Sequence, residues 1–296
     1  GIADQPWLNV QVGRFYLPVG EAYLRYGKGF AHRPLISQPV GGPWWWDEGV
    51  RIYGDLADGH LGYVASLSNG DTPFNGDSDG DKQASLKLIA RPFDWLHLSA
   101  SALRSGRIGR NGAPGSGALW LGESWARGFG SGTAVPSFVD GAAVPDGPDR
   151  LTDTLLLAGD VIVDLPEQLR LWLGFGRYEI ETDGASLYDR DLEYWIAELV
   201  LRGALISPEL SRVWLALRAD ALGTGDEDRG YLLDFRRAGT LGYNVESLTA
   251  YSLGLGWRLA HGLTLRAEYS FRNLELVDGL PPDLRNAARR VDLFGI

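Results

Sequence analysis

Cysteine and methionine are both absent from this chain of 296 residues. Without cysteine there is no disulfide, no catalytic thiol, no cysteine-ligated metal and no CxxCH sequence for attaching a c-type heme. Methionine is missing even at position 1, so we expect a processed chain whose signal peptide has been removed. We expect no cofactor.

Long hydrophobic runs are also missing. The best stretch, Leu155 to Leu165, is broken by Asp160 and Asp164, whereas a membrane helix needs about 18 apolar residues in a row. This excludes a helical membrane protein. Basic residues are outnumbered, and the net charge of -10 argues against a nucleic-acid partner. Glycine (40 residues) and aromatic residues (11%) are plentiful, which suits the turns and interfacial girdles of a membrane β-barrel.

Hydrophobic residues alternate with polar or small ones, most clearly between residues 247 and 272. One face of the first segment carries Leu253, Leu255 and Trp257, while the other carries Ser252 and Gly254. A helix would place its apolar residues three and four positions apart, so this period of two predicts β-strands with one apolar face. The same pattern predicts strands at 7–16, 47–57, 60–69, 83–91, 95–104, 151–165, 168–180, 191–203, 211–222, 247–260, 262–275 and 289–296.

Short and long connections alternate between these strands. Turns of a few residues lie near 58–59, 92–94, 165–167, 204–210 and 261–262, and longer connections span 17–46, 70–82, 105–150, 181–190, 223–246 and 276–288. This alternation is typical of outer-membrane barrels. We therefore predict an all-β fold, a transmembrane antiparallel up-and-down barrel forming a single domain over 1–296. A soluble β-sandwich or propeller is the alternative.

Three segments carry a resemblance to a known family. They are GRFYLPVG (Gly13–Gly20), DEGVRIYG (Asp47–Gly54) and SNGDTPFNGDSDGDKQASLKLIAR (Ser68–Arg91). Together they resemble the phosphate- and polyphosphate-selective porins of the bacterial outer membrane, and the match covers about a third of the chain.

That resemblance implies a sixteen-stranded trimeric porin of Gram-negative bacteria, with lipids, lipopolysaccharide and small anionic solutes such as phosphate as its partners. In the family the first motif follows several strands, so about four N-terminal strands and the end of the last strand are expected to lie outside this sequence. A barrel of twelve strands is the alternative. Passive diffusion needs no reaction step, so we expect no enzyme and no catalytic residues.

If the apolar face meets lipid, the other face lines water. Basic residues outnumber the six acidic ones there (Asp55, Asp160, Asp164, Glu198, Asp220 and Glu268), and the predicted anion-binding, pore-lining residues are Arg51, Lys87, Arg91, Arg170, Arg202, Arg212, Arg218, Arg258, Arg266 and Arg272. Arginine suits this role because its planar fork of donors holds oxyanions and keeps its charge. The alternative is that these residues only neutralise the acids of the wall.

The long segment 17–46 carries Arg25, Lys28 and Arg33. If it folds into the barrel, these residues would form a constriction that selects anions; otherwise it is an external loop. The run Trp44 to Trp46 that closes it is predicted to mark the outer membrane interface.

Other functions have weaker support. Asp77, Asp79 and Asp81 alternate as in calcium loops, but the positions of an EF-hand glycine and final carboxylate hold Lys82 and Leu88. Ser68 lacks the nearby histidine of an outer-membrane phospholipase. A structural barrel that anchors a surface layer, or that sheaths a partner such as a cytochrome, remains the main alternative to a porin.

Overall fold

The computed structural model describes residues 5–26, 33–43, 46–70, 81–106, 108–109, 137–139, 142–144, 151–182, 190–225, 245–260, 263–276 and 278. Eleven long strands in this part form one sheet, together with the two-residue strand β6 (Ile108–Gly109). The long strands are β1 (Asn9–Tyr16), β2 (Trp46–Leu56), β3 (Leu61–Ser68), β4 (Gln83–Phe93), β5 (Leu96–Arg104), β9 (Leu151–Leu165), β10 (Leu169–Thr182), β11 (Arg190–Arg202), β12 (Val213–Thr224), β13 (Val245–Ala260) and β14 (Leu263–Leu276).

The sheet is an antiparallel meander whose spatial order is the order of the chain. Its eleven long strands confirm the first eleven predicted strands to within two residues at each end. The predicted strand 289–296 lies outside the described residues. Residues 105–150 were expected to be a loop, but this segment also contains β6, which extends the ladder on β9, and a separate pair, β7 (Ser137–Val139) with β8 (Ala142–Val144).

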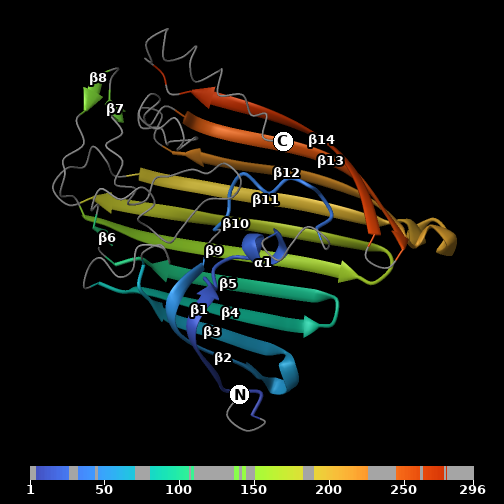
Figure 1. Cartoon of the computed structure of the whole chain (residues 1–296), viewed down its shortest axis with the longest axis horizontal. Helices are drawn as coiled ribbons and strands as arrows, with labels where there is room; N and C mark the ends of the chain where they lie inside the picture. The colour runs from blue at the N-terminus through green and yellow to red at the C-terminus, as the bar shows by residue number, and fades with distance from the viewer. Residues whose placement is uncertain are drawn as a thin grey trace.

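The sheet curls around the segment that joins β1 to β2, which contains the short helix α1 (Ala22–Tyr26) (Figure 1). No ladder joins β1 to β14 among the described residues. The described residues also include 3-10 turns at Ala57–Gly59, Gly203–Leu205 and Pro208–Leu210. Within the described ranges, no helix has the length and apolar character needed to cross a membrane.

Side chains on the convex, outward face follow the predicted alternation. Leu253, Leu255 and Trp257 are exposed on that face of β13, while Ser252 and Gly254 are buried on the other. Aromatic residues also face outward, both near the short turns, where the rings of Phe93 and Trp95 stack 5.2 Å apart, and midway along strands, as Phe175 and Trp195 do. Such a band suits contact with lipid and its headgroup boundary.

Outward-facing charges gather at the opposite end, where the long connections lie. Three exposed ion pairs there link neighbouring strands: Arg14 with Glu48, Arg104 with Asp153, and Arg177 with Asp191. Exposed pairs of this kind contribute little to stability. These pairs place charge at the long-connection rim of the outward face.

The inner face differs from the expectation of a uniformly polar wall. Along β9 to β13 it carries buried apolar side chains, including Leu156, Trp172, Tyr194, Ile196 and Leu248. These residues pack against Leu17, Val19, Ala22, Tyr26, Leu35 and Val40 of the β1–β2 connection, and we call the whole set the interior apolar cluster. The wall is apolar here because it is covered by protein and not by water.

Trp46, the described member of the tryptophan run, also packs against this cluster. It was predicted to mark the outer interface, and it lies at the long-connection end of β2, paired with the exposed Tyr16. Its role at an interface stays a prediction. Trp44 and Trp45 lie outside the described residues.

Candidate functional site

The connection between β1 and β2 lies against the inner face of the sheet. We call its described residues, 17–26 and 33–43, the lumenal loop. Its first half is held by β4 and β5: the Gly20 amide donates to Ser101 Oγ (3.0 Å), and Lys87 Nζ donates to the Gly20 carbonyl (2.7 Å) and to Glu21 Oε1 (2.6 Å).

Glu21 is the acidic centre of that contact. Its Oε1 lies 3.2 Å from His97 Nε2 as well as 2.6 Å from Lys87 Nζ. Burial alone would raise the pKa of Glu21, but the hydrogen bond with His97 and the charge of Lys87 outweigh it and lower the pKa to about 2. The loop is thus fixed here by a carboxylate that stays ionised at neutral pH.

Helix α1 brings cations and aromatic rings together at the middle of the wall. The Arg25 guanidinium lies 5.2 Å from the Trp172 ring centre, and the Tyr26 hydroxyl donates to Glu198 Oε2 on β11. Arg33 and Arg218 both lie over the Tyr26 ring, at 5.9 and 5.3 Å. Cation–π contacts of this kind hold a guanidinium without neutralising it.

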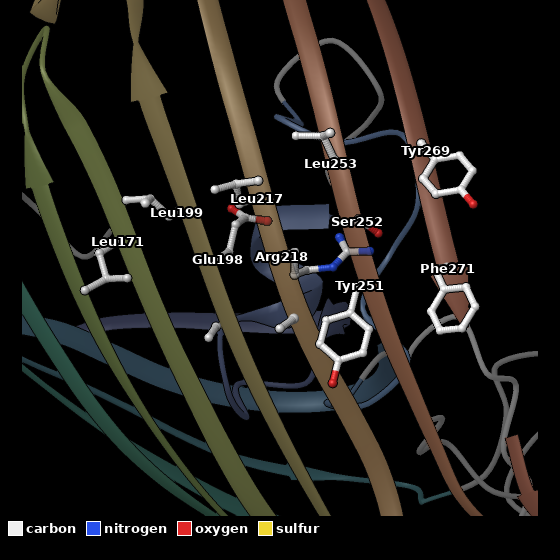
Figure 2. A pocket seen from close by; sticks show the side chains of 12 residues that line it. Leu171, Glu198, Leu199, Leu217, Arg218, Tyr251, Ser252, Leu253, Tyr269 and Phe271 are labelled. Atoms are coloured by element: carbon white, nitrogen blue, oxygen red, sulfur yellow. The ribbon is translucent and has the colours of Figure 1, made fainter. Parts of the chain in front are cut away.

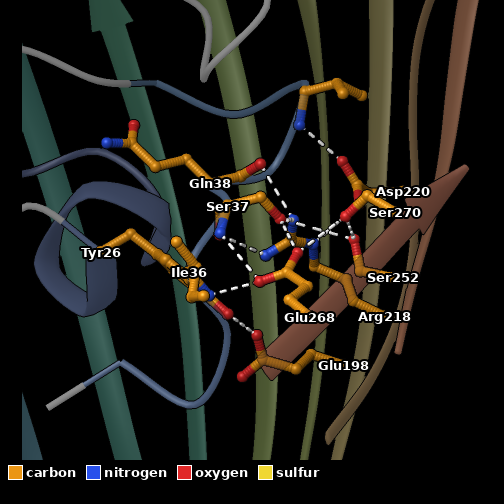
Figure 3. Close-up of polar contacts among 11 residues, drawn as sticks. Tyr26, Ile36, Ser37, Gln38, Glu198, Arg218, Asp220, Ser252, Glu268 and Ser270 are labelled. Carbon is orange, nitrogen blue, oxygen red and sulfur yellow. Dashed lines mark hydrogen bonds and ion pairs between the residues drawn. The ribbon is translucent and has the colours of Figure 1, made fainter. Parts of the chain in front are cut away.

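The second half of the lumenal loop is held by β12 and β14 (Figure 3). Arg218 donates to the Ser37 carbonyl (3.0 Å), Ser37 Oγ (2.6 Å) and the Gln38 carbonyl (2.9 Å), and its Nε pairs with Asp220 at 2.8 Å. The Glu268 carboxylate accepts hydrogen bonds from the amides of Ile36 and Ser37 and from Ser37 Oγ.

Glycines permit the closest approaches between the loop and the wall. A Cβ on Gly41 would lie 2.5 Å from Cβ of Tyr194, and one on Gly254 of β13 would lie 2.5 Å from Cδ2 of Leu35 in the loop. Within the wall, a Cβ on Gly256 would lie 2.0 Å from the Trp214 ring. Trp214 in turn donates from Nε1 to the Pro34 carbonyl at 3.1 Å. The wall is therefore shaped to receive this loop.

Five of the ten predicted pore-lining residues are paired with carboxylates. Lys87 pairs with Glu21 of the loop, and the other pairs are Arg91 with Asp55, Arg170 with Glu198, Arg202 with Asp164, and Arg218 with Asp220. For these residues the geometry favours the alternative interpretation, neutralisation of the acids. Arg218 and Lys87 also act as anchors of the loop.

The other five have different surroundings. Arg51 donates to Gln11 (2.9 Å) and lies between the rings of Phe15 and Tyr53, and Arg266 donates to the Arg33 carbonyl (3.1 Å). The charge of Arg272 acts on Asp220. Arg212 and Arg258 are exposed and have no polar side-chain partner among the described residues.

Of the predicted constriction residues, Arg25 and Arg33 lie inside the sheet and Lys28 lies outside the described residues. Asp77 and Asp79 of the weak calcium candidate also lie outside them. The described part of the chain contains no group of three or more metal-binding side chains. Glu21 and Ser37 were not singled out from the sequence, although Lys87, a lysine on the inner face with no acid on its own strand, signalled a partner elsewhere.

Grooves also open on the outward face of the described sheet. Leucine and aromatic side chains line the larger part of the first one, among them Leu171, Leu217, Leu253, Tyr251 and Phe271 (Figure 2). Leu98, Leu157, Val161, Phe175 and Trp195 contribute to the second. These surfaces belong to the lipid-facing band.

An antiparallel meander with an apolar outward face and a loop held inside defines the class: this is an outer-membrane β-barrel protein. Comparison with solved structures agrees. The outer-membrane expressed OmpT of Vibrio cholerae is similar with a TM-score of 0.57 and 10% identity, over 92% of this chain and 69% of that one. A trimer form of in-vitro folded OmpT from the same organism gives 0.54 and 10%, over 92% and 70%.

Those likenesses concern the fold, and they support a location in the outer membrane of Gram-negative bacteria. No family model matches the chain, and no curated protein sequence does either. The resemblance to phosphate-selective porins is therefore supported only at the coarser level of an outer-membrane barrel.

The comparison also corrects the expectation that the chain is not an enzyme. That exclusion was wrong, because the similar structures are those of OmpT, and a barrel shared at 10% identity leaves a catalytic role open. The lack of a recognisable catalytic triad in the sequence is not sufficient ground for excluding an enzyme, since catalytic groups are recognised by their geometry.

Proposed function

We propose that this protein is a porin, a single-domain barrel that passes small hydrophilic solutes and favours anions such as phosphate. One observation carries the proposal: the lumenal loop brings Arg25 to the part of the wall that holds Arg170. The positive charges of these two residues act on each other, and both Nε atoms are buried without a hydrogen-bond partner in the described part of the chain.

Such donors suit a passing anion. Arg170 shares the buried carboxylate of Glu198 with the nearby charges of Arg25 and Arg218, while Asp220 and Glu268 also act on that carboxylate. Guanidinium groups keep their charge and present donors in a plane that matches oxyanions. A ring of them inside a pore favours anions over cations.

The test is a planar bilayer with a salt gradient across the purified full chain. We expect a reversal potential on the anion side, because the buried Nε donors of Arg25 and Arg170 offer unsatisfied hydrogen bonds to an anion. Arg25→Gln should move that potential toward zero, whereas Arg177→Gln, which removes an exposed outward arginine from β10, should not. A wild-type potential on the cation side would refute the anion preference.

The oligomer is part of the same proposal. We propose a homotrimer, supported by the family resemblance and by the trimer form of the similar OmpT structure. The mass of the detergent-solubilised complex, measured by light scattering with the detergent subtracted, distinguishes three chains from one.

One observation favours a second candidate, a structural barrel that anchors a surface layer or sheaths a partner such as a cytochrome. The interior apolar cluster fills space that a wide pore would leave to water. A complete lack of conductance in the bilayer would support this candidate. Heme absorbance in the native complex would then identify a cytochrome as the partner.

A further inference from the structure

Three arginines occupy neighbouring positions at the short-turn end of the inner face. The ladder pairs Val213 with Trp257, and the next hydrogen bond runs from the Arg258 amide to the Arg212 carbonyl at 2.9 Å. Arg212 and Arg258 thus stand opposite each other, with Cα atoms about 5.5 Å apart in such a pair. On the other side Gly256 pairs with Arg266, which places Arg266 diagonally next to Arg258.

Among the described residues no carboxylate pairs with these three arginines, which we call the arginine triad. Arg212 and Arg258 have no polar side-chain partner in the described part of the chain, and the Arg266 contact is to a carbonyl, that of Arg33. Glu268, on the same face of β14 as Arg266, is occupied by the amides and hydroxyl of the lumenal loop.

The charged residues described nearby do not neutralise the arginine triad either. Arg202, on the next strand, is paired with Asp164. Glu209 is an exposed residue of the turn Pro208–Leu210 and has no ion pair among the described residues. Like charges directly opposite each other destabilise a sheet, so the arrangement of Arg212 and Arg258 costs free energy unless an anion lies between them.

We propose that the arginine triad is a binding site for small polyanions, solutes that carry two or more carboxylate or phosphate groups, at the short-turn mouth of the barrel. Arg258 and Arg266 stand on adjacent strands and Arg212 directly precedes β12, so a ligand with two oxyanion groups can bind two guanidiniums with a separate group each, whereas acetate has a single carboxylate. Arg212 and Arg258 are exposed and accessible to it. The inference deepens the proposed porin function and rests on it for the direction of solute flow.

The position of the site predicts that block of the current by a polyanion depends on the side of the membrane to which it is added. Because short turns face the periplasm in such barrels, a polyanion added on that side reaches the triad without crossing the constriction. We expect citrate or pyrophosphate on that side to block chloride current at concentrations about tenfold lower than on the opposite side.

Direct binding separates this proposal from the porin proposal. Isothermal titration calorimetry of the full chain, in neutral detergent at constant ionic strength, measures the dissociation constants of citrate and pyrophosphate in turn. Acetate is the monovalent comparison. The double variant Arg212→Gln/Arg258→Gln should weaken binding of the polyanions by about tenfold or more, since hydrogen bonds to charged groups are the strong ones. Arg104→Gln, an outward arginine at the opposite rim, is the control.

Each outcome decides something. Wild-type affinity in the double variant, or acetate binding as tightly as citrate, would overturn the proposal. Polyanion binding that depends on the triad, in a protein without conductance, would keep this site and reject the porin. Citrate alone binding would identify carboxylates as the ligand chemistry, and pyrophosphate alone would identify phosphates; either result supports the site.

Discussion

Replacing Glu268 by alanine should release the second half of the lumenal loop while leaving the barrel folded. The Glu268 carboxylate accepts three hydrogen bonds from Ile36 and Ser37, and hydrogen bonds to charged groups contribute about 1.5–3 kcal/mol each. Arg218 still holds the Ser37 and Gln38 carbonyls in the variant, and Glu268 is only partly buried. We therefore expect a loss nearer the value of two bonds, about 3 kcal/mol in the free energy of loop opening.

Hydrogen–deuterium exchange measures that opening directly. A loss of about 3 kcal/mol corresponds to exchange on the order of a hundredfold faster at the amides of residues 36–40. Glu275→Ala is the matched control, because Glu275 lies on the outward face of the same strand and its hydrogen bond is to Ser247. Unchanged exchange at residues 36–40 would refute the anchoring role. Acceleration spread equally over β10 to β12 would refute the independence of the loop from the barrel.

Two further predictions concern packing and acid. Gly256→Ala should lower the unfolding free energy by about 1–3 kcal/mol in urea titration, since the new Cβ would lie 2.0 Å from the Trp214 ring and must displace it; wild-type stability would contradict this. Glu21, whose pKa is lowered from 4.5 to about 2, stabilises the fold fully above pH 4.5, by about 3 kcal/mol, and loses this contribution as the pH falls toward 2. The stability difference between wild type and Glu21→Gln should therefore shrink below pH 4.5, and a difference that stays constant with pH would exclude the mechanism.

The strands could be predicted because lipid imposes a local rule. Each outward residue meets the same apolar medium, so apolar residues recur with a period of two in segments such as 247–260. This pattern can be recognised without knowing the contacts of the rest of the chain. The predicted strand bounds therefore agree closely with those in the structure. The fold class followed from the strands and from the alternation of short and long connections.

The interior could not be read in the same way, because it depends on which distant residues meet. Lys87 looked like a pore-lining cation until the loop supplied Glu21 as its partner. One signal was present in β11: Leu192, Tyr194 and Ile196 alternate with Trp195 and Leu199, so both faces of that strand are apolar. A strand that faces lipid on one side and water on the other has no reason for this pattern, and two-sided burial explains it.

The contacts of the lumenal loop also set an order of events during folding. Ser37 and its acceptor Glu268 are 231 residues apart in the chain, and Val40 and Asp220 are 180 apart. Contacts between residues so distant form late, since the intervening chain must be ordered first. The loop emerges near the start of the chain yet can dock only after β12 and β14 have joined the sheet. Its protection from exchange, followed in time, would thus report when barrel assembly is complete.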